Sequence, residues 1–150
     1  MRSAHRLLLA VLILFLNPSR SAPISVPFQI TSKGLIEVIC EMQSKPGKVL
    51  SCIIDTGAQN SMAAVSSVSS ESVHGAPTVG FLTAAGRQIA YLTKQTILLG
   101  GVPIPATVEV TPTVSAMGTD VLIGEDVLSQ FQSFRIDYTN RVLTYEIKQR

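Results

Sequence analysis

The chain has 150 residues, of which 46% are hydrophobic and 15% charged, and its formal net charge is +2. All of that positive excess comes from three arginines in the first 21 residues, since the remainder carries one more acid than base. Without a basic stripe, nucleic acid is not an expected partner, and the length suits one domain rather than two.

The first 21 residues have the pattern of a secretory signal peptide. Arg2 and Arg6 precede an uninterrupted apolar run over residues 7–16, and Asn17-Pro18 breaks it. The small residues around Ser21-Ala22 predict cleavage there, which would place the protein outside the cell or in a periplasm. This run is shorter than the about twenty residues that span a bilayer, and an uncleaved membrane anchor is the alternative. Residues 22–33 are then an N-terminal segment, and residues 34–147 form the main domain.

Short runs rich in β-branched residues and bounded by Gly, Pro or Ser predict strands along most of the domain. Their spacing leaves little room for helical crossovers, so we expect an all-β, mostly antiparallel domain. One helix is predicted over residues 125–131, because two acids at its start suit the helix dipole. The serine-rich residues 66–72 are expected to be an exposed loop. The predicted strands are residues 35–42, 49–54, 78–83, 88–92, 96–99, 106–110, 121–123, 134–137 and 142–147.

The two cysteines, Cys40 and Cys52, flank a predicted turn around Pro46-Gly47. An even number of cysteines in an exported chain favours a disulfide. A hairpin centred on Pro46 would place the two residues directly opposite each other. A two-residue Pro-Gly turn would shift the register by one and put them on opposite faces. A disulfide and a pair of small buried thiols therefore both remain open.

An acidic residue stands at the end of a strongly apolar strand, where Asp55-Thr56-Gly57-Ala58 follows Cys52-Ile53-Ile54. A carboxylate is costly to place there unless it is paired or shares its proton with another group. A second segment further along the chain, Leu122-Ile123-Gly124 followed by Glu125-Asp126-Val127-Leu128, gives this acid a specific context.

Together, the two segments resemble the retroviral-type, or retropepsin-like, aspartic proteases. Residues 97–101, 107–110 and 136–145 are similar to bacterial single-domain members of that family, and the resemblance covers nearly all of residues 34–147 in order. It implies a closed β-barrel or sandwich with one short helix. It also implies a flap hairpin over residues 78–92 that closes on bound peptide, with Ala84, Ala85, Gly86 and Arg87 as its tip.

The resemblance implies an aspartic endopeptidase in which two carboxylates hold one water between them. Because the chain has a single Asp-Thr-Gly, the second carboxylate must come from another subunit, so we expect a homodimer with Asp55 of each subunit at the two-fold axis. A protein or peptide is the expected substrate. Neither a metal nor a cofactor is implied. The chain termini are expected to add strands to the dimer interface.

Each neighbour of Asp55 has an expected role. Thr56 should hydrogen-bond across the dimer axis, Gly57 should allow close approach of backbones, and Leu122, Ile123 and Gly124 should pack behind the loop. Because Ala58 has no hydroxyl to donate to the carboxylate, we expect activity at weakly acidic pH, about pH 4–6.

Some positions depart from the viral pattern. Gln59 and Asn60 stand where viral enzymes usually have acids, and Glu125 stands where they often have Arg, so interchain ion pairs are not implied. The alternative function is a catalytically silent dimeric peptide-binding module on the same fold. Of the other acids, Asp120 is expected to serve its own turn and Asp126 the start of the helix.

A different hydrolase chemistry is not favoured by the sequence. His74 is the only histidine outside the leader, and it lies in a polar loop beside Gly75, where a solvated surface role is expected. A Ser-His-Asp or Cys-His hydrolase would have to use that residue. Asp137 is expected to end a hairpin strand.

Overall fold

The structure is a computed structural model that describes residues 22–83 and 86–149. The prediction of an all-β domain is confirmed, because strands dominate the described residues. The helices there number four, where the sequence predicts one, and all of them are short. In that part of the chain, none of the helices has the length and apolar character needed to cross a membrane. The helices are η1 (Val65–Ser67), α1 (Ser70–Val73), α2 (Thr113–Ala116) and α3 (Glu125–Leu128). The strands are β1 (Ile24–Ile30), β2 (Ile36–Met42), β3 (Leu50–Ile54), β4 (Met62–Ala63), β5 (Thr78–Thr83), β6 (Gly86–Leu99), β7 (Val102–Val110), β8 (Val121–Ile123), β9 (Phe131–Asp137) and β10 (Val142–Ile147).

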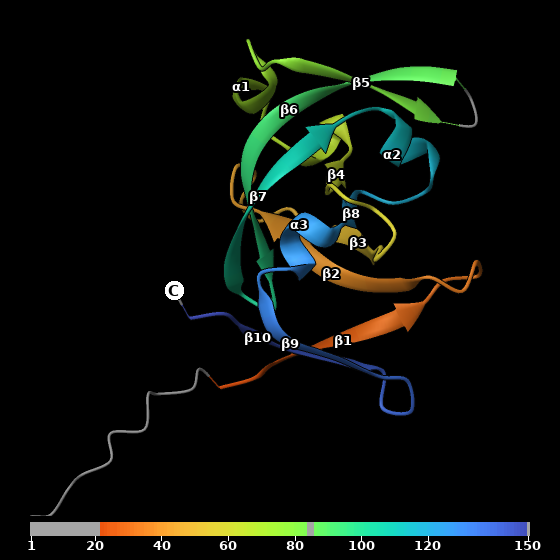
Figure 1. The fold of residues 1–150 in the computed structure, drawn as a ribbon, viewed down its shortest axis with the longest axis vertical. Coiled ribbons are helices and arrows are strands. Elements are labelled where there is room, and N and C mark those ends of the chain that lie inside the picture. Colours follow the sequence, from red (N-terminus) through yellow and green to blue (C-terminus); the bar gives the residue numbers. More distant parts are fainter. Residues whose placement is uncertain (1–21, 84–85, 150) are drawn as a thin grey trace, which may run out of the picture.

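The strands form one sheet that partly closes on itself. Its order is β5-β6-β7-β4-β8-β3-β2-β1-β10-β9, and an additional pairing between β2 and β6 joins six of the strands into a ring. The ring is not a clean barrel, because β4 has only two residues. The β5–β6 hairpin projects from one end of the molecule, and β1, β9 and β10 form the other end (Figure 1). The pairs β3–β8 and β4–β7 are parallel and the other pairs antiparallel.

The core follows the period of two that strands impose on their side chains. In β7, Ile104, Ala106, Val108 and Val110 are buried, while the residues between them face outward or are only partly covered. These side chains meet apolar residues of the facing strands in one continuous cluster. The interior of the ring is therefore filled by side chains.

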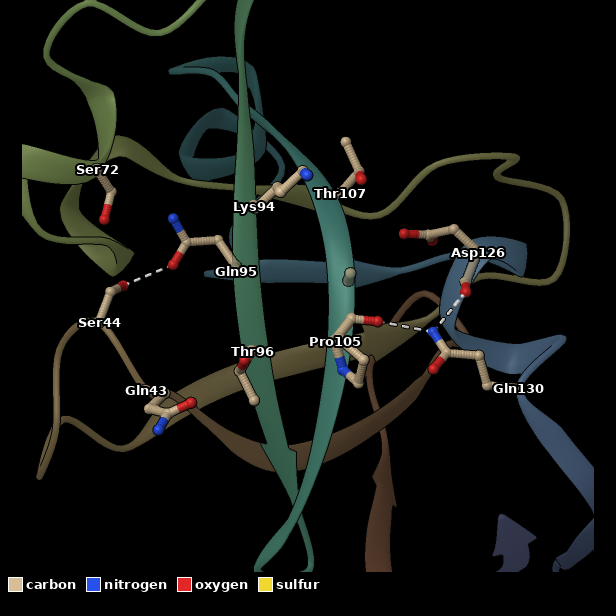
Figure 2. A pocket seen from close by; sticks show the side chains of 11 residues that line it. Gln43, Ser44, Ser72, Lys94, Gln95, Thr96, Pro105, Thr107, Asp126 and Gln130 are labelled. Carbon is tan, nitrogen blue, oxygen red and sulfur yellow. Dashed lines mark hydrogen bonds between the residues drawn. The ribbon is translucent and has the colours of Figure 1, made fainter. Parts of the chain in front are cut away.

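Strand β6 joins two segments that the sequence predicts as separate strands, residues 88–92 and 96–99. The polar residues between them, Thr93 and Gln95, are buried instead of forming a loop. Their polar groups have partners, because Gln95 accepts a hydrogen bond from Ser44 Oγ (2.7 Å, Figure 2) and its Nε2 donates to Thr93 Oγ1 (3.1 Å). Satisfied polar groups allow a strand to continue through the core.

Two other local predictions are wrong. Helix α3 ends at Leu128 and does not reach Phe131, which begins β9 and stacks on Tyr145 with ring centroids 4.3 Å apart. The serine-rich segment is not wholly exposed, because Ser67 is fully buried and its hydroxyl donates to Asp120 O (3.3 Å). In both places a tertiary contact overrides the local pattern.

Strand β1 was not predicted, since Pro27 interrupts its pattern and proline usually argues against a regular strand. Its first half pairs with β10 and its second half with β2. Because β10 also pairs with β9, both edges of the C-terminal strand are occupied within the chain, and β9 is the free edge at this end of the sheet.

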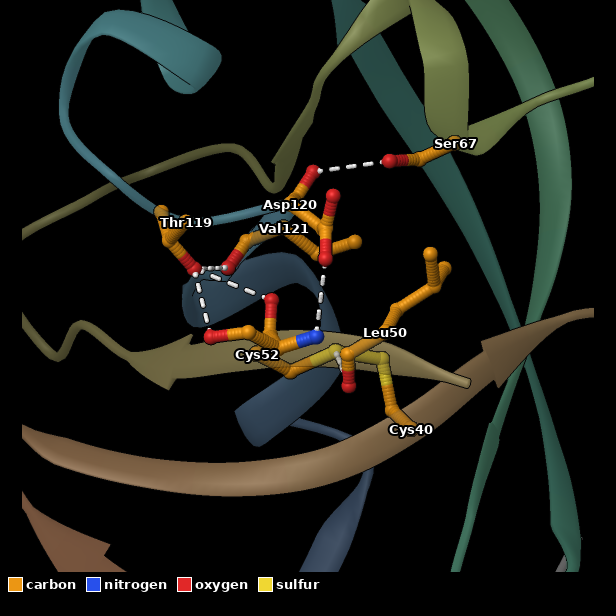
Figure 3. The surroundings of a disulfide bond; sticks show 8 residues. Cys40, Leu50, Cys52, Ser67, Thr119, Asp120 and Val121 are labelled. Atoms are coloured by element: carbon orange, nitrogen blue, oxygen red, sulfur yellow. Dashed lines mark hydrogen bonds between the residues drawn. A yellow bond between two sulfur atoms is a disulfide. The ribbon is translucent and has the colours of Figure 1, made fainter. Parts of the chain in front are cut away.

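A disulfide joins Cys40 of β2 to Cys52 of β3 (Figure 3). Neither of the two registers left open by the sequence occurs, because Cys40 faces Leu50 and Cys52 faces Val38. The cysteines are thus diagonal neighbours on one face, with Cα atoms 6.0 Å apart. Both are almost fully buried, so the disulfide fixes β2 against β3 shortly before that strand reaches Asp55.

Tyr145 provides a prediction for stability. Its hydroxyl donates to Leu99 O (2.7 Å) in the buried core, and burial raises the pKa of this phenol to about 12. We expect Tyr145→Phe to be less stable at pH 7 by about 1–3 kcal/mol, because the Leu99 carbonyl loses its donor. Since the folded chain holds the phenol proton more tightly than the unfolded chain, this group's stabilisation is complete below about pH 10 and is lost as the pH rises through about 12.

Urea unfolding at pH 7 and over the alkaline range would measure both effects. The exposed Tyr138 supplies the matched control, since Tyr138→Phe should leave the neutral stability and the alkaline slope near those of the wild type. Equal stability of Tyr145→Phe and the wild type at pH 7, with parallel alkaline curves, would contradict the role assigned to this hydroxyl.

Candidate active site

Asp55 lies directly after β3, which runs through the middle of the sheet between β2 and β8. Its backbone N–H donates to Ile123 O (2.9 Å), so the start of the Asp-Thr-Gly loop is an extension of the β3–β8 ladder. The carboxylate is partly buried, and its Oδ1 accepts a hydrogen bond from Gly57 N (3.0 Å). The loop therefore orients one oxygen of Asp55 and leaves the rest of the group accessible.

The Leu122-Ile123-Gly124 segment lies behind this loop. Leu122 and Ile123 face Ile53 and Ile54 in the parallel β3–β8 pair, and all four side chains are buried. Two main-chain hydrogen bonds then join the following residues to the loop, Glu125 N to Ala58 O (2.8 Å) and Asp126 N to Gln59 O (3.2 Å). Two segments about seventy residues apart in sequence thus form one rigid unit.

Position 124 requires glycine because there is no room for a side chain, and not because of its backbone angles. A Cβ atom at this position would lie 2.8 Å from Ala58 O and 2.8 Å from both the carbonyl carbon and oxygen of Asn60. Those atoms belong to the backbone of the loop, so they cannot move aside as a flexible side chain could. At Gly57 the contact is milder, because an added Cβ would lie 3.3 Å from Asp55 Oδ1.

Ser61 and Asp126 connect the two segments through their side chains. Asp126 Oδ1 accepts hydrogen bonds from both Ser61 N (2.8 Å) and Ser61 Oγ (2.7 Å). The buried Ser61 hydroxyl also accepts from Gly124 N (2.9 Å). The other oxygen of Asp126, Oδ2, is buried and has no hydrogen-bond partner among the described residues. Asp126 therefore holds the end of the Asp-Thr-Gly loop.

The predicted roles of two acids are accordingly wrong. Helix α3 has Gly124 as its N-cap with no side-chain hydrogen bond there, so Asp126 does not cap it. The Asp120 side chain bonds outside its own turn, since its Oδ2 accepts from Ser51 N on β3 (3.0 Å). The partners are more than sixty residues away in each case, so local sequence gave no signal for them. Asp137 does close its hairpin, where hydrogen bonds from Asn140 lower the pKa of the carboxyl.

The Ser61 hydroxyl offers a second test of stability. We expect Ser61→Ala to destabilise the fold by about 1–3 kcal/mol, because Gly124 N–H loses its acceptor in a buried position and Asp126 loses a donor. Thermal or urea unfolding would measure this cost. Ser115→Ala is the matched control, because that serine is exposed on α2 and its side chain makes no hydrogen bond among the described residues. An equal effect of the two variants would contradict the proposed connection.

The predicted flap corresponds to the hairpin of β5 and β6, in which Leu82 pairs with Arg87 and Thr83 with Gly86. Ala84 and Ala85 lie outside the described residues. Gly86 has φ of +106°, a conformation that favours glycine. The two faces of the hairpin differ in how exposed their side chains are. Ala90 is buried, whereas the opposite face carries Arg87 and the exposed side chains of Leu82 (83% exposed) and Ile89 (62% exposed).

The Asp-Thr-Gly loop supplies one acid, Asp55, to the candidate site. Thr56 is exposed, and its side chain makes no hydrogen bond within the described part of the chain. In that part, no group of three or more His, Cys, Asp or Glu side chains could hold a metal ion. The open cavity beside β6 and β7 (Figure 2), of about 650 Å³, is lined by Asp126 but not by Asp55. Within one chain, the Asp-Thr-Gly loop thus presents one oriented carboxylate.

Comparisons with known proteins bear on the fold. No protein-family model matches the chain, and no curated protein matches its sequence. Among solved structures, the chain is similar to a retropepsin-like aspartic protease from Rickettsia conorii, with a TM-score of 0.58 and 16% identity, covering 83% of this chain and 90% of that one. A simian foamy virus protease matches with a TM-score of 0.44 and 17% identity, over 62% of this chain and 91% of that one. The likeness to the bacterial protein, together with the strand order and the two connected motifs, shows that this chain has the retropepsin-like fold.

Proposed function

We propose that the protein is an aspartic endopeptidase whose active site forms when two copies of the chain each contribute Asp55. The observation that carries this proposal is the position of the Asp55 carboxylate, oriented by Gly57 N–H on a loop fixed by residues 123–126. The retropepsin-like fold supports it. A buried network that fixes one accessible carboxylate is what a catalytic acid requires.

The chemistry follows from two carboxyl groups at close range. At about 3 Å apart, two such groups cannot both be ionised, so the pair holds one proton. The ionised Asp55 takes a proton from a water held between the two groups, and the water oxygen attacks the peptide carbonyl carbon. The protonated Asp55 gives its proton to the carbonyl oxygen. As the C–N bond of the tetrahedral intermediate breaks, the carboxyl group that took the water proton gives it to the leaving nitrogen. The other carboxylate takes a hydroxyl proton from the intermediate, which becomes the carboxylic acid product, so the pair again holds one proton.

We also propose that the chain is exported. The leader pattern lies outside the described residues, so the support within the structure is the buried Cys40–Cys52 disulfide. Disulfides persist in oxidising compartments and are rare in reducing ones.

One observation favours the alternative, a catalytically silent peptide-binding module. Both edges of β10 are paired within the chain, so β10 cannot also pair with a strand of a second subunit. At this end of the sheet, the free edge of β9 is the edge left for pairing with a strand of a second subunit. A weakly held dimer would leave each Asp55 without its partner.

Proteolysis of an unfolded protein substrate by the purified full-length chain, from pH 3 to 7, tests the proposal. We expect peptide products that a statine-type transition-state analogue suppresses, because such analogues bind far more tightly than substrates. Sedimentation of the same sample gives the oligomeric state. A confirmed dimer without cleavage would instead support the binding module.

A further inference from the structure

Glu109 occupies a strand position between the flap and the loop that carries Asp55. In β7 it pairs with Leu92 of β6 on one side and with Met62 of β4 on the other. Strand β6 runs from the tip of the flap hairpin through Leu92. Strand β4 begins directly after the loop that carries Asp55. Glu109 N also donates to Ser61 O at the end of that loop (3.0 Å). If the hairpin closes over a peptide bound at Asp55, that peptide would lie beside this stretch of β7.

The side chain of Glu109 is directed toward the loop. Its Oε1 accepts a hydrogen bond from Asn60 Nδ2 (2.7 Å), and Asn60 is exposed five residues after Asp55. This is the one side-chain hydrogen bond of Glu109 among the described residues, so Oε2 keeps its accepting capacity. Lys94 lies two residues beyond Leu92 on β6 and on the same face of the sheet, and no ion pair joins it to Glu109 among the described residues. Asn60 therefore positions a carboxylate with an open oxygen beside the substrate path.

Because the Glu109 carboxylate is partly buried, it should favour a positively charged partner over a neutral one. Glu109 is partly covered by its neighbours, and a charge there interacts more strongly with an opposite charge than a fully solvated one does. Oε2 can accept from an ammonium or a guanidinium, and charge-assisted hydrogen bonds are stronger than neutral ones. A neutral donor would gain a weaker hydrogen bond there, and an acidic side chain would be repelled.

We propose that Glu109 selects substrates with a Lys or Arg side chain close to the scissile bond. This inference rests on the proposed endopeptidase function. Glu109 acts here as a specificity residue and takes no part in the proton transfers at Asp55. Its effect should therefore depend on the charge of the substrate and not on the chemical step.

A series of otherwise neutral peptides tests the proposal, each carrying Lys or the uncharged norleucine at one position within four residues of the cleavage site. With the full-length wild-type chain we expect kcat/KM to be about fivefold higher for Lys than for norleucine at one or more positions. Glu109→Gln keeps an oxygen for Asn60 and removes the charge. It should abolish the preference and leave kcat on the norleucine peptides unchanged. Glu71→Gln, on exposed α1, removes the same charge elsewhere and should keep the preference.

The outcomes separate this inference from the proposed function. Cleavage that requires Asp55 but shows no Lys preference, or keeps it in Glu109→Gln, overturns the inference and leaves the endopeptidase function standing. An equal loss of activity on Lys and norleucine peptides in Glu109→Gln would assign the residue a structural role and also overturn it. Absence of any cleavage that requires Asp55 overturns both.

Discussion

Replacing Asp55 by Asn is expected to lower peptide hydrolysis by about 10³-fold or more, because general acid–base catalysis contributes about 10²–10⁴-fold and both carboxyl groups of the dyad are lost together. An amide can neither accept the proton of the attacking water nor hold the proton that the carbonyl oxygen receives. Initial rates on the unfolded protein substrate at pH 4–6, compared at equal dimer concentration, would measure the loss.

The folded state should tolerate this change. An Asn side chain keeps an oxygen that can accept from Gly57 N–H, so we expect Asp55→Asn to stay folded and dimeric. Asp137→Asn makes the same chemical change in the exposed hairpin turn, where the acid accepts from Asn140, and should retain activity. Residual hydrolysis by Asp55→Asn close to the wild-type rate would remove Asp55 from the mechanism.

Gly124→Ala is expected to have the second largest effect. Its Cβ would meet the backbone of Ala58 and Asn60 at 2.8 Å, so the loop that carries Asp55 would have to move. Overpacking typically costs about 1–3 kcal/mol, and here we also expect at least tenfold lower activity, since a small displacement of a catalytic group can cost about 10²-fold. Urea unfolding and kcat on a peptide substrate would measure the two effects.

Gly80→Ala separates crowding from the mere replacement of a glycine. A Cβ at Gly80 would approach the Arg87 guanidinium at 3.2 Å, and that flexible group can move away. We expect its stability to stay within about 0.5 kcal/mol of the wild type, as for most surface substitutions. A Gly124→Ala protein as stable and as active as the wild type would show that the two segments are not packed as described.

The sequence predicted most strands because their apolar residues and turn signals are local. It failed at β1, where Pro27 interrupts the pattern, and within β6, where Thr93 and Gln95 suggest a break that buried hydrogen bonds remove. The end of α3 was placed too late, because Phe131 belongs to the pattern of the next strand and stacks on Tyr145. These errors all arise where a distant partner determines the local structure.

In the candidate site, too, the sequence identified the residues that local motifs mark and missed the contacts that depend on distant residues. Asp55, Gly57 and the Leu122-Ile123-Gly124 segment could be identified from their motifs, and the structure brings them together. The alternation of the 106–110 strand indicates that Glu109 faces outward, but nothing local indicates that it meets Asn60, 49 positions away. Likewise, the local pattern predicted that Asp126 serves the start of the helix, although its carboxylate accepts a hydrogen bond from Ser61.

Mixing wild-type and Asp55→Asn subunits at constant total concentration tests most directly that two chains share one active site. After subunit exchange, mixed dimers hold one carboxyl group and should be inactive, so activity should follow the square of the wild-type fraction. At equal amounts of the two chains we expect about a quarter of the activity of the wild type alone. A linear dependence, with about half of the activity at equal amounts, would show that each chain works by itself and would contradict the shared dyad.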